Sequence, residues 1–516
     1  MDRRAFLKTL GLGAAASAVT LGPVAGVAGA SPAPAGRAGA PPRTPLRPTF
    51  GRMFPQLPPF APPGPGLTEA LLDIGRPGGI LDAGDDLTAD PLALIVDPAL
   101  RVDNPDNPTH TAGVTFMGQF IDHDVTFDVE SGLGVPTDPR TTPNARTAAL
   151  DLDSVYGAGP VASPHLYDDG QRSKFRYESG GMFEDVPRDA DMAAVISDPR
   201  NDEHVILSGL HCAFMKFHNE VVEAVSRPGM GDLEAFGAAR RVTTWHYQWM
   251  VVDQFLPLFC GRAVVDDVVR RGRRWYTAGD FMPVEFQTAA YRFGHSMVRP
   301  SYRANMNGQD GGPFVGLIFD AGAEPSDDPG DLVGGFRAPR RFVGWETFFD
   351  FGDGNVRNNK LVDTKLSTPL FHLPLSAIAT GDQPTVLPQR TLLRHVTWSM
   401  PSGQAVARAM GAPVLAAADL SELSGYGLGL EASTPLWYYV LKEAELVAGG
   451  LHLGPVGGRI VAEVLIGLLQ ADPHSYLNAP GGWRPSLPQR GGRATGEFEM
   501  VDLLTFAGVD PASRSS

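Results

Sequence analysis

Residues 202–225 read DEHVILSGLHCAFMKFHNEVVEAV, and this stretch decides the fold class. Its apolar side chains recur every three or four residues, at Ile206, Leu210, Phe214, Phe217, Val221 and Val225. Because an α-helix turns every 3.6 residues, this spacing predicts one long helix whose apolar face packs against a core. Asp202 and Glu203 are expected in its first turn, where the helix dipole favours carboxylates.

The same spacing recurs in three further segments. They cover residues 238–259, which Gly261 ends, and residues 437–447 and 458–469. Segments with the strict apolar and polar alternation of strands are scarce. The sequence therefore predicts a mainly α fold with long loops and little β structure.

Composition narrows the classes of function. The chain has 516 residues, of which 43% are hydrophobic, so it can bury a large core. A formal net charge of −15 argues against the broad cationic surface that nucleic-acid binding needs. Cys212 and Cys260 are the only cysteines, so a disulfide scaffold is excluded, and we expect both to be ordinary buried thiols.

The N-terminus has the pattern of an export signal. Arg3 and Arg4 precede a weakly apolar stretch that ends in the small residues Ala28-Gly29-Ala30. Residues 1–30 are therefore predicted to be a twin-arginine signal peptide, and an N-terminal membrane anchor is the alternative. The expected location is periplasmic or extracellular. No later run approaches the ~20 apolar residues of a spanning helix, so we do not expect the mature protein to span a membrane.

The remaining chain is expected to form one domain. Residues 31–65 are rich in Pro, Ala, Gly and Arg without a hydrophobic period, which predicts an extended arm with little folded structure. Residues 66–510 contain no internal repeat or second low-complexity linker, so a single catalytic domain is predicted, followed by a short tail at 511–516.

Residues 117–124, MGQFIDHD, carry the first candidate chemistry. His123 lies between Asp122 and Asp124 in an otherwise apolar segment, and buried charges need a partner or a metal ion. A solvent-exposed helix end is the alternative for this fragment alone.

Two later segments strengthen the functional interpretation. Residues 200–204, RNDEH, directly precede the long predicted helix, and residues 291–296 read YRFGHS. Gly294 beside His295 would let a bulky planar group approach the backbone closely. A structural histidine is the alternative for His295 when this segment is taken alone.

Together the three segments resemble the animal-type haem peroxidases, the superfamily of myeloperoxidase, lactoperoxidase and peroxinectin, in their order and internal spacing. The likeness extends to residues 245–261, 390–404, 435–477 and the segment around 503–504. It thus covers most of residues 66–510 and implies a haem-peroxidase-like helical domain. The leader adds the expectation of an exported bacterial member.

The resemblance implies a role for each matched residue. The implied catalytic set is His123 as distal acid and base, Arg200 as distal arginine, and Gln119 near the substrate or halide site. The implied cofactor is haem b, held by His295 as proximal iron ligand, Arg292 and the propionate arginine Arg394, with Asp122 and Glu203 matching the two ester-forming carboxylates. The sequence permits these esters but does not require them.

A calcium site is implied as well. Its matched residues are Asp124, Thr147, Ala149, Asp151 and Asp153. Closely spaced oxygen donors on a short turn are the ligands that Ca²⁺ prefers. Without the resemblance, a solvated turn is the alternative for Asp151 and Asp153.

The implied reaction is reduction of hydrogen peroxide through a ferryl intermediate, followed by oxidation of small donors such as halides, thiocyanate or phenols. His204 stands where myeloperoxidase has the methionine of a third haem link, which favours bromide, iodide or thiocyanate over chloride. Thr391 stands where mammalian members have an asparagine bonded to the proximal histidine, so the partner of His295 stays open.

Other functions remain as alternatives. A haem-dependent fatty-acid dioxygenase would have a tyrosine three residues before the proximal histidine, whereas this position is Arg292 and Tyr291 is one place away. A non-catalytic secreted interaction protein on the same scaffold leaves the histidine and arginine set unexplained. A metal hydrolase is disfavoured, because His211 and His218 are seven residues apart and are expected to be core or boundary residues.

Overall fold

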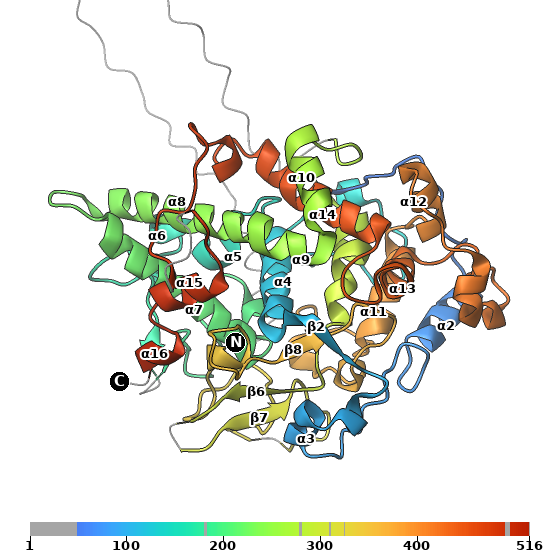
Figure 1. Cartoon of the computed structure of the whole chain (residues 1–516), viewed down its shortest axis with the longest axis horizontal. Coiled ribbons are helices and arrows are strands. Elements are labelled where there is room, and N and C mark those ends of the chain that lie inside the picture. Colours follow the sequence, from blue (N-terminus) through green and yellow to red (C-terminus); the bar gives the residue numbers. More distant parts are fainter. Residues whose placement is uncertain are drawn as a thin grey trace, which may run out of the picture. The chain divides into compact units, whose positions relative to one another are not determined.

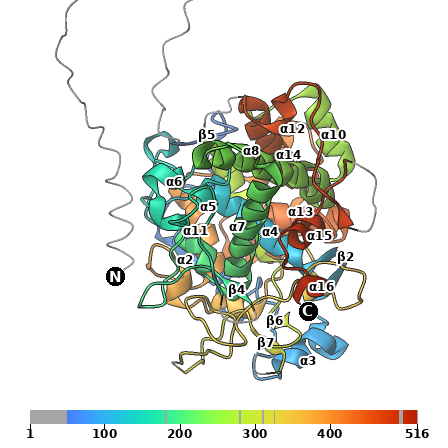
Figure 2. The same ribbon diagram turned by 90° about the vertical axis from the view of Figure 1, so that its left-hand side faces the viewer.

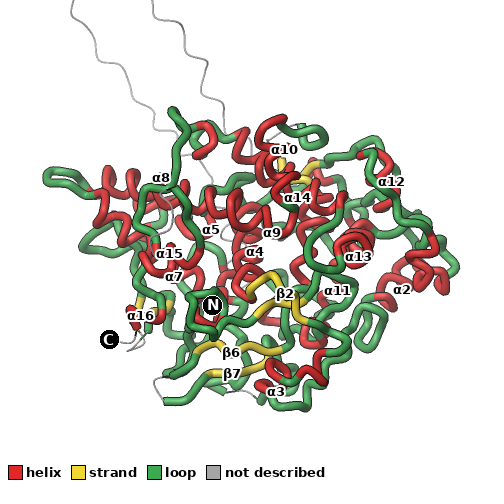
Figure 3. The backbone as a smooth tube through the Cα atoms, in the orientation of Figure 1, coloured by secondary structure: helices red, strands yellow, loops and turns green. Residues whose placement is uncertain are grey.

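The computed structural model describes residues 49–179, 183–277, 281–308, 311–324, 326–490 and 496–514. The predicted signal peptide and residues 31–48 of the predicted arm lie outside this part. The described chain is mainly helical with long loops, as predicted, and its strands are short (Figure 3).

Most of the secondary structure is α-helix (Figure 1). The α-helices are α2 (Pro65–Ile74), α3 (Pro91–Val96), α4 (Ala112–Val125), α5 (Asp153–Tyr156), α6 (Gly159–Ala162), α7 (Val205–Val225), α8 (Asp232–Met250), α9 (Leu256–Cys260), α10 (Arg262–Arg271), α11 (Leu387–Thr397), α12 (Gly403–Met410), α13 (Leu436–Ala448), α14 (Pro455–Ala471), α15 (Met500–Phe506) and α16 (Pro511–Arg514).

Helix α7 is the long helix predicted from residues 202–225, but it begins later. His204 is its N-cap, with extended backbone (φ −152°, ψ 160°) and a side chain that accepts a hydrogen bond from Leu207 N. The expectation that Asp202 and Glu203 lie in the first turn is therefore wrong. Asp202 ends a separate 3-10 turn, η4 (Pro199–Asp202), and forms an ion pair with Arg188 at 2.8 Å.

Helices α7 and α8 pack against each other, and α4 lies beside α7 (Figures 1 and 2). The predicted helix over residues 238–259 is present as α8, a π-helical turn η5 (Val251–Phe255) and α9. Pro257 lacks an N–H, so it cannot continue the regular hydrogen-bond pattern, and the wider turn lies just before it. Gly261 then ends the helix with φ +78°, as predicted.

The strands form two-stranded pairs. They are β1 (Thr49–Gly51) with β5 (Phe281–Pro283), β2 (Asp106–Thr111) with β8 (Asn358–Lys360), β3 (Glu178–Ser179) with β4 (Glu184–Asp185), and β6 (Ser301–Asn305) with β7 (Phe314–Leu317). The first pair is parallel and the others are antiparallel. The β6–β7 pair lies below α4 in Figure 1, away from α8 and α14.

The predicted arm is wrong from Thr49 onward. Phe50, Phe54 and Phe60 are buried in the core, and β1 pairs with β5. The buried carboxylate of Glu285 accepts hydrogen bonds from the backbone N–H groups that follow β1, at Met53 and Phe54. Spaced aromatic side chains thus anchor a segment whose proline content suggested an unfolded one.

The expected burial of the cysteines and of two histidines, and two further predicted helices, agree with the structure. Cys212 and Cys260 are buried free thiols, and His211 and His218 are buried, as expected. Helices α13 and α14 match the two remaining predicted segments. Among the described residues, no helix has both the length and the apolar character needed to cross a lipid bilayer.

Candidate functional site

Eight residues predicted to act in catalysis or cofactor binding line one cavity of about 250 Å³, far larger than the ~30 Å³ of one water molecule. They are Gln119, Asp122, His123, Arg200, Glu203, Arg292, His295 and Arg394. They come from α4, the junction of η4 and α7, the 3-10 segment η7 (Ala290–His295), and α11. The fold therefore gathers side chains that are far apart in the sequence.

We define the distal side of this cavity by His123, Arg200 and Asn201. Hydrogen bonding there determines which nitrogen of His123 carries the proton. His123 Nδ1 lies 2.9 Å from Asn201 Oδ1, and Asn201 Nδ2 lies 3.0 Å from His211 Nδ1. Because a carboxamide oxygen can only accept, His123 carries its proton on Nδ1 and keeps an unprotonated Nε2. Burial, followed by the charge of Arg200, holds the pKa of His123 well below its usual value. The imidazole is therefore a neutral base.

Arg200 is held by four hydrogen bonds. Its Nε and Nη2 donate to the two oxygens of Asp198 at 3.0 and 2.7 Å. Nη2 also donates to His123 O at 2.9 Å, and Nη1 donates to Thr126 O at 2.8 Å. One N–H of Nη1 has no acceptor in the described part of the chain, and Arg200 lines the cavity. This group can therefore stabilise negative charge on a ligand there.

A second distal network joins three residues of the cavity wall. His204 Nε2 lies 3.0 Å from Gln119 Oε1, and Gln119 Nε2 donates to Glu203 Oε2 at 3.1 Å. Gln119 comes from α4, whereas the other two directly precede α7. The network thus links the two helices across the cavity edge.

We define the proximal side by His295, Arg292 and Thr391. In the part of the chain that the structure describes, His295 lacks a hydrogen bond of the kind that His123 has on the distal side. His295 Nδ1 is buried and has no hydrogen-bond partner among the described residues. Thr391 Oγ1 donates to Leu387 O at 3.2 Å instead. The ring of His295 packs edge-on against Trp437, with centroids 6.1 Å apart. Burial, followed by the charge of Arg292, holds the pKa of His295 well below its usual value.

The residues of the cavity fit a haem group. Asp122 Oδ1 is buried without a hydrogen-bond partner in the described chain, and burial raises the pKa of this carboxyl group. Its other oxygen lies 4.0 Å from Arg292 Nη2. A Cβ added at Gly294 would meet no atom within 4 Å, so the backbone beside His295 is open to a planar ligand. One cavity thus contains the neutral His295, a carboxyl oxygen of Asp122 without a hydrogen bond, and open space beside Gly294.

Arg394, the predicted propionate arginine, is already engaged. It forms an ion pair with the buried Asp128 and donates to Ser131 Oγ at 3.1 Å. Both Arg394 and Asp128 line the cavity. A ligand carboxylate would therefore share Arg394 with Asp128 or replace Asp128 as its partner.

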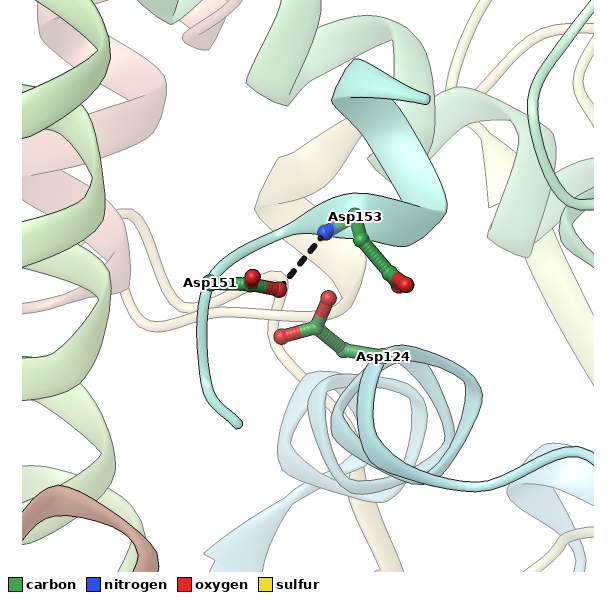
Figure 4. Close-up of side chains that lie close together, drawn as sticks. All are labelled: Asp124, Asp151 and Asp153. Carbon is green, nitrogen blue, oxygen red and sulfur yellow. Dashed lines mark hydrogen bonds between the residues drawn. The ribbon is translucent and has the colours of Figure 1, made fainter. Parts of the chain in front are cut away.

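The predicted calcium ligands form a separate cluster. Carboxylate oxygens of Asp124, Asp151 and Asp153 lie within 4.8 Å of one another. Figure 4 shows Asp124 reaching from α4 toward Asp151 in a loop and Asp153 at the start of α5. Thr147 Oγ1 donates to Asp151 at 2.8 Å, and Ala149 lies in the same loop. Burial, followed by the two neighbouring acids, raises the pKa of Asp124 well above its usual value.

Sequence reasoning missed two residues that order the distal side. Asn201 orients His123, and its signal was its position beside Arg200 in the segment RNDEH. Asp198 holds Arg200, and it also forms an ion pair with Arg146 at 3.2 Å. The charges of these arginines lower the pKa of Asp198 although burial opposes this. No periodic pattern marks such residues.

Comparison with known proteins finds similarity to animal haem peroxidases over part of the chain. Residues 128–313 match the family model for animal haem peroxidases, a segment that includes Arg200 and His295 and begins just after His123. Peroxidase mlt-7 from Caenorhabditis elegans is 26% identical over 212 residues, which are 36% of this chain and 29% of that protein. Heme peroxidase 2 from the same organism is 30% identical over 184 residues, 32% of this chain and 26% of that protein. Mouse eosinophil peroxidase is 26% identical over 183 residues, 31% of this chain and 25% of that protein.

Solved structures share the fold. Peroxidase A from Dictyostelium discoideum has a TM-score of 0.53 at 15% identity, covering 83% of this chain and 90% of that one. Fatty acid alpha-dioxygenase from Oryza sativa has a TM-score of 0.52 at 15% identity, covering 76% of this chain and 74% of that one. At such identity the likeness concerns the fold alone.

These matches support a relationship to the animal-type haem peroxidase superfamily over about a third of the chain. The matched segments span less than a third of the length of the curated relatives named above.

Proposed function

We propose that this chain is a haem-dependent peroxidase that reduces hydrogen peroxide and oxidises small donors. The observation that carries the proposal is the 2.9 Å contact of His123 Nδ1 with Asn201 Oδ1, which leaves Nε2 to act as the base on the same cavity as His295. A neutral base beside an arginine N–H is the pair that cleavage of a peroxide O–O bond needs.

Haem b, held by His295 and flanked by Arg292 and Asp122, would supply an iron centre that takes two oxidising equivalents from hydrogen peroxide and passes them to the donors. His123 Nε2 would accept the proton of the near peroxide oxygen and deliver it to the far oxygen as water leaves. The free N–H of Arg200 would stabilise the negative charge on that departing oxygen. Asn201 keeps the proton on His123 Nδ1, so Nε2 stays available for both transfers.

The proposed donors are iodide, bromide, thiocyanate and phenols. His204 cannot form the sulfonium link that a methionine at this position forms in myeloperoxidase, so we do not expect efficient chloride oxidation. Asp122 and Glu203 line the cavity and could form ester links to haem in a peroxide-driven reaction. Mass spectrometry of haem-bearing peptides, obtained by proteolysis after peroxide treatment, would detect them.

The test is an absorption spectrum of the protein expressed with haem supply and Ca²⁺, before and after stoichiometric hydrogen peroxide. The Soret band should shift rapidly in the wild type and about 10²- to 10⁴-fold more slowly in the His123→Ala variant. His218→Ala is the matched control, because this buried histidine contacts Tyr156 and not the cavity. A well-folded protein without a Soret band would refute the proposal. Oxygen uptake with linoleate and no peroxide would instead support a dioxygenase.

We further propose that Asp124, Asp151 and Asp153 bind Ca²⁺ with Thr147 and the carbonyl of Ala149. The support is the gathering of three carboxylates, the fully buried Asp124 on α4, Asp151 in a loop and Asp153 at the start of α5. Ca²⁺ at a thousandfold excess over its Kd should raise the free energy of unfolding by about 4 kcal/mol. Asp151→Asn should lose this stabilisation, whereas Asp353→Asn, at an exposed loop, should keep it. Equal responses to Ca²⁺ in the two variants would exclude the site.

Residues 1–30 are proposed to direct twin-arginine export to a periplasmic or extracellular location. Replacing Arg3 and Arg4 by lysines should retain a fused reporter in the cytoplasm. Unchanged export of that fusion would contradict the proposal.

A further inference from the structure

We propose that Arg146 is a positioning residue that couples the proposed Ca²⁺ site to the distal Arg200. Ca²⁺ on Asp153 would release Arg146 toward Asp198, and Arg200 would then present more of its positive charge to the cavity. The coupling rests on the proposed Ca²⁺ site, and its consequence for the reaction rests on the proposed peroxidase function.

The first step is a continuous chain of buried charges. Arg146 Nη1 donates to Asp153 Oδ1 at 3.3 Å, and Arg146 Nε lies 3.2 Å from Asp198 Oδ2. The same oxygen of Asp198 accepts a hydrogen bond from Arg200 Nη2 at 2.7 Å. Arg146, Asp198 and Arg200 are all buried. Because water and salt screen buried charges little, a change at one end of this chain acts on the other end.

The second step is the incomplete bonding of Arg146. Its Nε is buried and lies close to Asp198, but the N–H is not aligned for a hydrogen bond with any acceptor in the described part of the chain. Burial raises the pKa of Asp198, but the charges of Arg200 and Arg146 outweigh burial and lower it, so Asp198 remains a carboxylate. One guanidinium is thus shared between two carboxylates. Arg146 can gain a full hydrogen bond to Asp198 when its attraction to Asp153 weakens.

The third step is the competition that a cation would create. Asp153 is one of three carboxylates whose oxygens lie within 4.8 Å of one another, so Ca²⁺ bound there would neutralise its charge. Arg146 would then be attracted mainly to Asp198. Since Asp198 Oδ2 also holds Arg200, a stronger contact with Arg146 would leave Arg200 less neutralised. The free N–H of Arg200 would then stabilise negative charge on a ligand more strongly.

Coupling between two sites is reciprocal, so it can be measured at the cation site without following the reaction. Arg200→Gln leaves Asp198 free to hold Arg146 more tightly, which draws Arg146 away from Asp153. The Kd of Ca²⁺, measured by calorimetric titration of the full chain, should therefore fall about five- to tenfold. In an Arg146→Gln background, which lacks the connecting guanidinium, Arg200→Gln should change this Kd by less than about twofold.

Arg240→Gln is the matched control. Arg240 Nη2 lies 3.5 Å from the backbone oxygen of Asp151, beside the same carboxylates, and Arg240 has no ion pair with Asp198 among the described residues. In this background the full effect of Arg200→Gln should remain.

Arg146→Lys serves as a second test if Arg146→Gln does not fold. Lysine keeps the positive charge but carries it on one nitrogen, whereas Arg146 contacts Asp153 and Asp198 through different nitrogens. The effect of Arg200→Gln on the Kd of Ca²⁺ should therefore shrink in this background as well.

The outcomes separate the proposals. A wild type that binds no Ca²⁺ would refute the Ca²⁺ site and the coupling together. A protein that binds Ca²⁺ but whose Soret band ignores peroxide would refute the peroxidase function, while the Kd values still test the coupling. An equal Kd in the wild type and Arg200→Gln would overturn the role of Arg146. An effect of Arg200→Gln that persists in Arg146→Gln would also overturn it, because the distal charge would then act on the cation directly through space.

Discussion

The two sides of the cavity differ in how far their polar side chains are hydrogen-bonded to other residues of the protein. On the distal side, His123 Nδ1 is bound to Asn201, and four of the five N–H groups of Arg200 have protein acceptors. On the proximal side, His295 Nδ1 is buried without a partner in the described part of the chain. The distal groups are thus oriented before any ligand binds. On the proximal side, His295 keeps a nitrogen without a hydrogen bond, next to the open space beside Gly294.

This difference has a physical meaning. Buried polar groups are nearly always hydrogen-bonded, since an unpaired one costs about 1–3 kcal/mol. A side that leaves such groups unpaired is the side where a ligand completes the structure. A side whose reacting groups are already oriented by protein partners can hold charges and protons in place during a reaction, because little reorganisation is needed. The contrast therefore agrees with a proximal binding role and a distal chemical role.

The largest expected effect concerns Asn201. Asn201→Leu removes the acceptor of His123 Nδ1–H, so both tautomers become accessible and the buried N–H loses its partner. The rate of reaction with hydrogen peroxide, measured by stopped-flow absorption, should fall about a hundredfold or more.

Two controls give this prediction its force. Asn201→Asp keeps an acceptor and should retain most of the rate. Asn219→Leu removes a buried amide of helix α7, bonded to the backbone of Phe175, and should lower stability without changing the peroxide reaction. A normal rate in Asn201→Leu would show that the distal side is not ordered by this contact.

A smaller effect is expected in the pH dependence of stability. Burial lowers the pKa of His211, which accepts from Asn201, to about 4. Between pH 4 and 6.5 the unfolded chain therefore binds more protons than the folded chain. The contribution of neutral His211 to the free energy of unfolding is complete above pH 6.5 and is lost as the pH falls toward 4. The loss is up to about 3 kcal/mol.

Urea unfolding across this range can measure the loss. His211→Gln should start from lower stability at pH 7 but lose less of it on acidification. His372→Gln, at an exposed position, should follow the wild-type curve. Parallel curves for all three proteins would contradict burial of a neutral His211.

The smallest expected effect is on the proximal side. Thr391→Asn should provide an acceptor for His295 Nδ1–H, which makes an iron-bound imidazole more basic. The reduction potential of bound haem, measured by spectroelectrochemistry, should become more negative. Thr391→Val, which provides no acceptor, should keep the wild-type potential. An unchanged potential in Thr391→Asn would mean that position 391 does not control the partner of His295.

Much of the fold was predictable from local patterns. The apolar spacing from Ile206 to Val225 predicts α7 because a helix repeats every 3.6 residues. The start of α7 was not predictable in the same way, since it depends on the side chain of His204 reaching back to Leu207 N. Phe50, Phe54 and Phe60 were also missed, because composition cannot reveal which distant surface buries an aromatic side chain.

The candidate site divides similarly. The family resemblance of the segments MGQFIDHD, RNDEH and YRFGHS singled out residues that line one cavity. The partners that orient them, Asn201 for His123 and Asp198 for Arg200, follow from three-dimensional contacts without a periodic signal. The sequence left the partner of His295 open because of Thr391, and in the described part of the chain His295 Nδ1 has no hydrogen-bond partner.

The most direct test of the central claim is a haem titration of the wild type, His123→Ala and His295→Gly, followed by the Soret band. The account predicts one tightly bound haem in the wild type and in His123→Ala. His295→Gly should lose the histidine-ligated spectrum and regain it when imidazole is added. If His295→Gly keeps the wild-type spectrum while His123→Ala loses it, the assignment of binding and chemical roles to the two sides of the cavity is contradicted.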